Sequence, residues 1–215
     1  MPFLPQYNGY MFRRLGAFFL DTLEVIVFAI GIFFFVYLLI MRPHKIKGAS
    51  MMPNFPDSEY LLTEKVTYYL HEPVRGDVVV FTPPPQSGDL SSIDCGVIVS
   101  TPTAEISDEY IKRVIAVPGE RVMIKEGHVY INGKLLKEPY IADPVTTEAK
   151  TFLCEGEEYT VPPAELFVMG DNREHSSDSR YWGPIPKKSI SGRAWIIYWP
   201  VNFSGSVKKP DYDSL

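Results

Sequence analysis

The chain has 215 residues, of which 46% are hydrophobic, 22% charged and 13% aromatic, and its formal net charge is −5. The length suffices for one buried domain of ordinary size, and the normal apolar content and two cysteines exclude a disordered tail or a disulfide-dense miniprotein. The acidic balance argues against a nucleic-acid backbone as the main partner. Residues 1–47 contain five Lys/Arg and two Asp/Glu, whereas residues 48–215 contain sixteen and twenty-four. A basic, apolar N-terminus therefore precedes an acidic remainder.

An uncharged apolar run of seventeen residues, 25–41, lies in the N-terminal region. As a helix the run would be about 26 Å long, and with Thr22 and Leu23 it approaches the ~30 Å hydrocarbon core of a bilayer. An acidic residue at the centre of a membrane helix costs about 3 kcal/mol, so Asp21 and Glu24 are expected at the headgroup boundary. The sequence predicts a short cytoplasmic segment at residues 1–21 and a transmembrane helix at residues 22–41.

Two other interpretations of this run are disfavoured. A cleavable signal peptide has an apolar region of roughly 7–15 residues followed by a small-x-small site, whereas a charged stop at residues 42–45 (RPHK) follows here. A core helix of a domain would show a polar face, and the run has none. The cations lie on both sides of the run, at Arg13 and Arg14 and again beyond residue 41, so the positive-inside rule leaves the orientation open.

After the anchor, short β-branched and aromatic runs between turn residues predict a mostly β domain with an antiparallel sheet at residues 42–203. The predicted strands are residues 77–81, 93–100, 110–117, 122–125, 129–131, 166–169 and 194–199. Asn132-Gly133, within residues 128–135, is typical of a type I′ hairpin turn. Nineteen prolines and the lack of a 3.6-residue period after residue 50 argue against long helices. The predicted loops are residues 82–88, 101–107 and 140–160, and residues 204–215 are expected to form a frayed C-terminal tail.

Several common kinds of site are missing from the sequence. It contains no H-E-x-x-H, no P-loop, no G-x-G-x-x-G and no G-x-S-x-G elbow. The four histidines are not at metal-ligand spacing, and two distant cysteines do not form a zinc site. Cys95 and Cys154 could pair in an oxidising compartment or could be two small core residues. We therefore expect neither a metal nor a cofactor.

Three segments after the anchor concentrate residues suited to catalysis. The first, residues 48–54 (GASMMPN), places Ser50 between small residues and a Met-Met-Pro turn, which can expose its hydroxyl and backbone N–H. The second, residues 110–119 (YIKRVIAVPG), is predicted as a strand with Lys112 on the same side as Tyr110. The third, residues 169–183 (MGDNREHSSDSRYWG), suits a hydrogen-bonded loop. Taken singly, each is also compatible with a linker, an edge strand or a solvated loop.

Together with GDVVVF at residues 76–81, these segments form four boxes in order behind an apolar anchor. The sequence resembles the type I signal peptidases, membrane-bound serine proteases with a Ser–Lys dyad, from the anchor to about residue 199. The resemblance implies removal of signal peptides from exported preproteins after small-x-small sites, with no metal or cofactor. It also implies a catalytic domain outside the cytoplasm on a bacterial-type plasma membrane. The implied partners are preprotein signal peptides and the lipid bilayer, with no obligate protein partner.

The resemblance assigns the central roles to two residues. Ser50 matches the nucleophile, and its backbone N–H would supply the oxyanion hole. Lys112 matches the general base. Some members of the family add a serine hydroxyl two residues before the nucleophile, but that position is Gly48 here. Only backbone donation to the oxyanion is therefore expected.

Supporting roles follow from the same resemblance. Ser176 matches the hydroxyl that orients the lysine. Asp178 matches the acidic residue that shapes its loop, by pairing with Arg113 or Arg180. Gly170 begins the box that carries both residues.

One departure from the commoner pattern lies in the third box. Glu174-His175 stands where an Asp-Asn pair is usual, which leaves a histidine beside Ser176. A Ser–His arrangement using His175 is an alternative, but no orienting carboxylate for it is evident.

A lysine can act as a base only in its neutral form. Its ordinary pKa is about 10.4, so work near pH 8 requires a pKa lowered by roughly 2–3 units. Desolvation against apolar neighbours can lower it, and Val114 and Ala116 on the predicted strand are candidates. The charge of Arg113 would add a smaller effect.

The anchor would hold Ser50, nine residues beyond Met41, near the membrane surface where a cleavage site emerges. Four hydrophobic residues near the nucleophile are expected either at the bilayer interface or in the core: Met51, Met52, Phe55 and Leu61. Two other functions remain as alternatives. One is a different Ser–Lys protease, such as a self-cleaving repressor, and the other is a membrane-tethered β domain that binds exported chains without cutting them.

Overall fold

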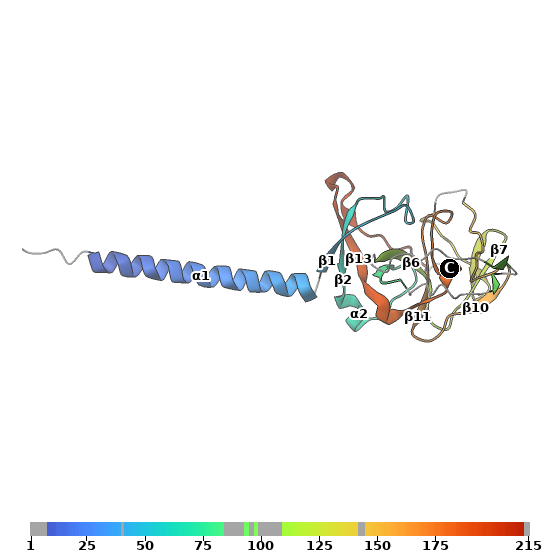
Figure 1. Ribbon diagram of the computed structural model, residues 1–215, viewed down its shortest axis with the longest axis horizontal. Coiled ribbons are helices and arrows are strands. Elements are labelled where there is room, and N and C mark those ends of the chain that lie inside the picture. Colours follow the sequence, from blue (N-terminus) through green and yellow to red (C-terminus); the bar gives the residue numbers. More distant parts are fainter. Residues whose placement is uncertain are drawn as a thin grey trace, which may run out of the picture. The chain divides into compact units, whose positions relative to one another are not determined.

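The computed structural model describes residues 8–39, 41–83, 93–94, 97–98, 109–141 and 145–212 (Figure 1). The chain divides into two compact units, Met1–Met41 and Arg42–Leu215. The first unit is helical and the second is mostly β, so the division falls where the apolar run ends.

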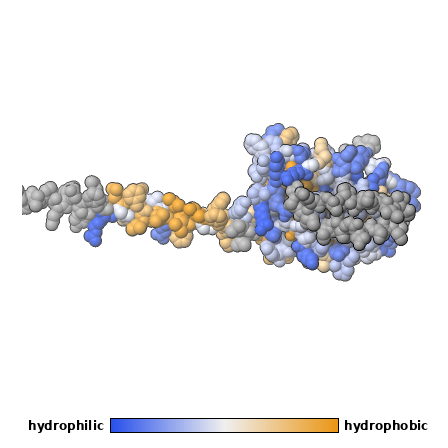
Figure 2. All heavy atoms as spheres, viewed as in Figure 1, coloured by the Kyte–Doolittle hydropathy of each residue, from blue (hydrophilic) through white to orange (hydrophobic). Residues whose placement is uncertain are grey.

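The first unit contains one described helix, α1 (Asn8–Leu39). Its stretch Arg13–Tyr37 has 25 residues and a mean hydropathy of 2.3, and its most apolar window is not buried. Figure 2 shows apolar side chains along the helix. At 1.5 Å per residue this stretch is about 37 Å long. It is therefore long and apolar enough to cross a membrane. The helix begins well before Thr22, because no proline interrupts residues 8–21.

The second unit is built on an eight-stranded sheet with the order β1-β2-β13-β3-β6-β11-β12, in which β14 also pairs with β13. Its strands are β1 (Met41–Lys45), β2 (Tyr60–Glu64), β3 (Val78–Phe81), β6 (Tyr110–Ala116), β11 (Glu165–Met169), β12 (Ile185–Pro186), β13 (Ile190–Trp199) and β14 (Gly205–Ser206). Neighbouring strands pair antiparallel, as predicted. The ten-residue β13 pairs with β2, β3 and β14, and bulges shift its register along the way.

Smaller elements complete the domain. A four-stranded sheet has the order β10-β7-β8-β9, and β4 pairs with β5. These strands are β4 (Ile93–Asp94), β5 (Val97–Ile98), β7 (Arg121–Lys125), β8 (His128–Ile131), β9 (Lys134–Leu135) and β10 (Glu158–Thr160). The short helices are α2 (Val66–Leu70), α3 (Ser179–Trp182), and the 3-10 turns η1 (Lys187–Ser189) and η2 (Val201–Phe203).

Every predicted run contains a strand within the described residues. Residues 101–107 and most of 82–88, both predicted as loops, lie outside the described residues. The strands that the sequence did not predict are β1, β2, β10, β12 and β14. β1 contains Pro43 between charged residues and β10 has only three residues, so neither shows the alternation typical of a strand. The last part of the predicted loop 140–160 is this β10, which pairs with β7.

Strand β6 lies in the interior of the large sheet, between β3 and β11. Its side chains contribute to three hydrophobic clusters: Ile111 to the first, Val114 to the second, and Ile115 with Ala116 to the third. The alternative interpretation of this segment as an edge strand with solvated cations is therefore wrong. The two charged side chains of β6, Lys112 and Arg113, are therefore buried and need polar partners inside the domain.

The expectation of a frayed tail is wrong for the described residues after 204. β14 pairs with β13, and the Val207 N–H donates to the Trp195 carbonyl at 2.8 Å. Val207 and Tyr212 are partly buried against the hydrophobic core. The tail is ordered because its apolar side chains, which are separated by lysines and a proline in sequence, find core positions only in the folded domain.

The predicted hairpin turn at Asn132-Gly133 is confirmed. Both residues have positive φ, 53° and 78° respectively, as a type I′ turn requires. The turn joins β8 to β9, with Ile131 opposite Lys134. The local sequence alone determines this element.

We expect Gly133→Ala to destabilise the protein by about 1 kcal/mol, because a side chain is strained at positive φ. Urea unfolding followed by tryptophan fluorescence in detergent measures the change. Lys134→Ala, on the exposed side of β9, is the control and should change stability little. Equal stability of both variants would contradict the turn assignment.

Candidate active site

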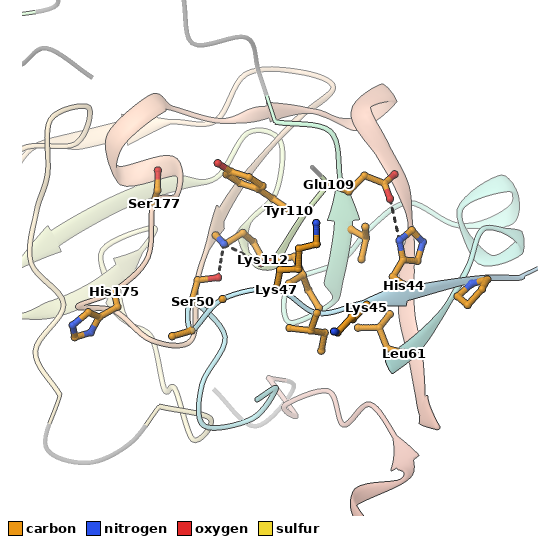
Figure 3. A pocket seen from close by; sticks show the side chains of 16 residues that line it. His44, Lys45, Lys47, Ser50, Leu61, Glu109, Tyr110, Lys112, His175 and Ser177 are labelled. Carbon is orange, nitrogen blue, oxygen red and sulfur yellow. Dashed lines mark hydrogen bonds and ion pairs between the residues drawn. The ribbon is translucent and has the colours of Figure 1, made fainter. Parts of the chain in front are cut away.

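The structure brings Ser50 and Lys112 into contact, although they are 62 residues apart. Lys112 Nζ lies 2.7 Å from Ser50 Oγ and 3.1 Å from the Ile111 carbonyl, to which it also donates. Figure 3 shows the two side chains pointing toward each other. Both line a cavity of about 690 Å³ whose wall includes residues of β1, the turn after it, and the start of β6. A hydroxyl and an amine thus meet at the edge of a cavity large enough for several peptide residues.

Burial perturbs the Lys112 ammonium. The residue is 3% exposed, and burial lowers the pKa of Lys112 to about 8. The carboxylates of Asp178 and Asp171 oppose this shift, and the charge of Arg180 supports it. A substantial fraction of this lysine is therefore neutral at mildly alkaline pH, as a base must be.

The predicted causes of this desolvation are partly correct. Lys112 pairs with Val79 on β3, and Val79 and Val114 belong to one core cluster, in agreement with the predicted side of the strand. Ala116 packs in a different cluster. Arg180, and not the sequence neighbour Arg113, is the cation that lowers the lysine pKa.

The Ser50 turn is held from one side by Asn172. The backbone N–H of Asn172 donates to the Ser50 carbonyl at 3.0 Å, and its side-chain amide donates to the Ala49 carbonyl at 3.0 Å. On the other side, Gly48 has a φ of +88° and its N–H donates to Asp57. The turn is therefore fixed at both ends, with the Ser50 hydroxyl facing the lysine.

The hydrophobic residues after Ser50 mostly lie in the core. Met51, Phe55 and Leu61 are 1%, 3% and 1% exposed, whereas Met52 is 42% exposed. The core alternative for the first three is therefore the one observed. Their burial fixes the Ser50 turn to the hydrophobic core.

The Ser50 backbone N–H donates no hydrogen bond within the described part of the chain. It is free to donate to the oxyanion that forms on a carbonyl oxygen when the Ser50 hydroxyl attacks the carbonyl carbon. At Gly48 no side chain supplies a second donor, in agreement with the sequence.

Gly170 is required by close packing at the dyad. A Cβ atom built on it would lie 2.2 Å from Ser176 Oγ and 2.4 Å from the Ser50 carbonyl oxygen. Neither contact is physically possible, and one of them is with backbone. The glycine thus allows the third box to lie directly against the nucleophile turn.

Ser176 is buried beside this glycine, and its hydroxyl lies near the Asp178 carboxylate without reaching hydrogen-bond geometry with any described residue. The expected contact with Lys112 is therefore not formed in this structure.

Asp178 is fully buried and accepts from Arg180 at 2.8 and 2.9 Å and from the Gly170 N–H at 3.0 Å. Burial raises the pKa of the Asp178 carboxyl, but the hydrogen bonds and charge of Arg180 outweigh burial and hold the pKa below its ordinary value.

The sequence left Arg113 or Arg180 as the partner of Asp178, and the partner is Arg180. Arg113 instead pairs with Asp171, which the sequence analysis missed. The Arg113 guanidinium donates to the two Asp171 oxygens at 2.8 and 2.7 Å, and Asn54 donates to the same carboxylate at 2.9 Å. The available signal was Asp171, an acid in the third box to which the sequence analysis gave no role.

A second missed pair is Arg173 with Glu138. Arg173 is 1% exposed, and it also donates to Thr147 Oγ1 at 2.7 Å and to the Gly170 carbonyl at 3.0 Å. Its partner lies in a segment without a strand or motif signal. The sequence offered no indication of this contact.

His175 lines the cavity, but its ring points away from Ser50 (Figure 3). Its side chain forms no hydrogen bond within the described residues, so the geometry does not favour the Ser–His alternative.

Within the same residues, no group of three His, Cys, Asp or Glu is placed to hold a metal ion. Cys154 is disulfide-bonded, and Cys95 lies outside the described residues.

We expect Asp178→Asn to destabilise the protein by about 3–5 kcal/mol, because it leaves the buried Arg180 guanidinium without a counter-charge. Chemical unfolding of the full chain in detergent measures this change. Glu174→Gln, at an exposed position of the same loop, is the control and should change stability by at most about 0.5 kcal/mol. Similar losses in the two variants would show that the buried pair has no special role.

Comparison with known proteins identifies the family of this chain. The family described as signal peptidase, peptidase S26, matches residues 19–199. A probable signal peptidase I-2 of Synechocystis is 36% identical, over 82% of this chain and 69% of that protein. A signal peptidase I of Leptolyngbya laminosa is 35% identical, over 86% and 80%. A signal peptidase I of Bacillus licheniformis is 31% identical, over 89% and 92%. The serine and lysine lie 2.7 Å apart at a cavity, in the unit that follows the apolar N-terminal helix in sequence. This chain belongs to the signal peptidase family, peptidase S26.

Proposed function

We propose that this chain is a membrane-anchored serine endopeptidase that removes signal peptides from exported preproteins, with Ser50 as nucleophile and Lys112 as general base. The observation that carries the proposal is the 2.7 Å contact between Ser50 Oγ and the buried Lys112 Nζ. Burial lowers the pKa of Lys112 to about 8, so near this pH the amine can be neutral and still accept a proton.

The reaction follows from these positions. Neutral Lys112 takes the proton of the Ser50 hydroxyl as Oγ attacks the scissile carbonyl carbon. The oxyanion accepts a hydrogen bond from the Ser50 N–H. The Lys112 ammonium then protonates the leaving amine as the carbon–nitrogen bond breaks. A water molecule, activated by neutral Lys112, hydrolyses the acyl-enzyme and restores the serine.

The supporting residues act through the position of the dyad. Gly170 lets the third box approach the nucleophile turn, and Asn172 holds the carbonyls of that turn. Asp178 orders the loop through Arg180. The buried Ser176 hydroxyl is close to the dyad, and we propose that it turns to Lys112 when a substrate fills the cavity.

The orientation in the membrane is part of the proposal. A preprotein signal peptide lies in the bilayer, and its small-x-small cleavage site emerges on the far side of the membrane from the cytoplasm. The anchor α1 ends at Leu39, eleven residues before Ser50. The side on which the cleavage site emerges supports a catalytic domain on the extracytoplasmic side of a bacterial-type plasma membrane, with residues 1–21 in the cytoplasm. The lipid bilayer and preproteins are the proposed partners, without an obligate protein partner.

The test of the dyad is cleavage of a preprotein with an A-x-A site by the purified protein in detergent, with the product's N-terminus read by mass spectrometry. We expect a single cut after the second alanine. Because deprotonation of Lys112 activates it, the rate should rise with pH through a midpoint of about 8. Ser50→Ala and Lys112→Arg should each lower turnover at least about 1,000-fold, the second because an arginine stays charged.

Activity that survives Lys112→Arg would exclude the lysine as base and return His175 to consideration. A folded wild-type protein that binds the preprotein but does not cut it would instead support a tethered binding domain. Cleavage at sites without small residues would indicate a Ser–Lys protease with another substrate.

A second prediction concerns Gly170. We expect Gly170→Ala to lower turnover by about 100-fold or more, because the added methyl group must displace Ser176 or the Ser50 carbonyl. Initial rates of preprotein cleavage measure the loss. Gly31→Ala is the matched control, since no heavy atom lies within 4 Å of its added Cβ. Near wild-type activity of Gly170→Ala would mean that the third box does not need to contact the nucleophile turn.

A further inference from the structure

The C-terminal strap, residues 205–212, runs from β14 to Tyr212. It begins at β14 on the long β13 and continues through Val207, whose side chain packs on the core cluster that contains Met51 and Phe55. It then forms part of a hollow lined by Asn54, Arg113 and other residues. The strap therefore contacts the layer that supports the Ser50 turn.

The strap presses on Gly76, just before β3. A Cβ built on Gly76 would lie 2.8 Å from the Tyr212 ring, 3.2 Å from Pro210 and 3.3 Å from Lys209. The carbonyl of Gly76 accepts from Arg113 Nη1 at 3.1 Å, and its N–H donates to Val114. The strap thus lies against the same short segment that holds the Arg113 guanidinium.

Tyr212, the last residue of the strap, lies beside the aromatic Tyr140 and the cationic Arg75. It packs on the core cluster that contains Tyr140, and its ring lies 5.8 Å from the Arg75 guanidinium carbon. The Tyr140 ring lies 4.2 Å from the Arg113 guanidinium carbon. Burial raises the pKa of Tyr212, and Tyr140 and Arg113 are close enough to oppose that shift. Tyr212 therefore lies close to Tyr140 and to the Arg113 guanidinium, which binds Asp171.

The Arg113–Asp171 pair is linked by hydrogen bonds to the turn that contains Ser50. Asp171 accepts from Asn54, which follows the turn, and Asn172 next to it donates to the carbonyls of Ala49 and Ser50. Asp171 also raises the pKa of Lys112. A change in the Arg113–Asp171 pair would therefore alter the dyad in two ways, through the position of Ser50 and through the charge near Lys112.

We propose that Tyr212 is a positioning residue for the Ser50–Lys112 dyad, acting by keeping water from the Arg113–Asp171 ion pair. This inference rests on the proposed function of the dyad, which it extends to the C-terminal strap. The contact is made chiefly by the ring, because the Tyr212 hydroxyl, although close to the Tyr140 hydroxyl, does not reach hydrogen-bond geometry with any described residue.

The expected direction of the pH effect follows from two causes with the same sign. Without the ring, Arg113 neutralises Asp171 less completely, and the uncompensated carboxylate raises the lysine pKa. Water that enters beside β6 also reduces the desolvation of Lys112, which raises the pKa again. The pH midpoint of cleavage should therefore move upward from about 8.

The experiment compares the full-length wild type with Tyr212→Phe, Tyr212→Leu and Tyr212→Ala in detergent, well below their unfolding temperatures. We expect Tyr212→Ala to lower kcat about tenfold with little change in KM, since small displacements of reacting groups cost this much. Its pH midpoint should rise by about half a unit or more. Tyr212→Phe should retain wild-type kcat and midpoint. Tyr212→Leu should show a smaller shift in the same direction, and it carries the test if the alanine variant does not fold.

Tyr69→Ala is the matched control, because Tyr69 is 77% exposed on α2. A lower unfolding temperature of Tyr212→Ala with unchanged kcat and pH midpoint would mean a merely structural role and would overturn the proposal. So would equal effects of the alanine and phenylalanine variants. NMR titration of the Lys112 Nζ in wild type and Tyr212→Ala, with ¹⁵N-labelled lysine, reads the same shift without catalysis. If the wild type cleaves no preprotein, the proposed function fails, and this titration still decides the effect of the strap.

Discussion

The burial of a lysine in the middle of a β-sheet is the constraint on which the rest of the domain depends. Lys112 is 3% exposed on β6, which has strands on both sides. An ammonium in such a place is costly, so its pKa is lowered to about 8 and the neutral amine becomes available. The same burial leaves the amine with few partners, chiefly the Ser50 hydroxyl and one carbonyl. A position that is unfavourable for the fold is thus useful for the chemistry.

Around this lysine the domain places three buried arginines, each with defined acceptors. Arg113 binds Asp171, Arg180 binds Asp178, and Arg173 binds Glu138. Buried ion pairs contribute little net stability, but removing one partner is strongly destabilising. Their geometry is specific because guanidinium and carboxylate meet in fixed planes. We interpret the three pairs as the framework that holds the third box against the nucleophile turn, where Gly170 leaves room for contact.

Local patterns in the sequence predicted much of this architecture. The strand runs, the Asn132-Gly133 turn and the apolar N-terminal helix depend on neighbouring residues, so their patterns are visible in the chain. The four boxes indicated Ser50 and Lys112 through their resemblance to the type I signal peptidases, since each segment alone was also compatible with a linker, an edge strand or a solvated loop. β1 and β12 escaped notice, since a proline-containing strand and a two-residue strand depend on pairing with distant partners.

The sequence by itself determined the fold class, the candidate anchor and the residue types able to form a dyad. Only the tertiary structure decided which acid pairs with which arginine, that Asp171 and not Asp178 binds Arg113, and that residues 205–212 are ordered. The Arg113–Asp171 contact joins residues far apart in the chain, whereas Asp178 and Arg180 are only two residues apart. Several pairings of these acids and arginines are nevertheless compatible with the same local pattern. The choice among them depends on which side chains the sheet brings within hydrogen-bond distance after burial. The lowered pKa of Lys112 belongs to the same class, because desolvation is a property of the packed domain and not of the strand.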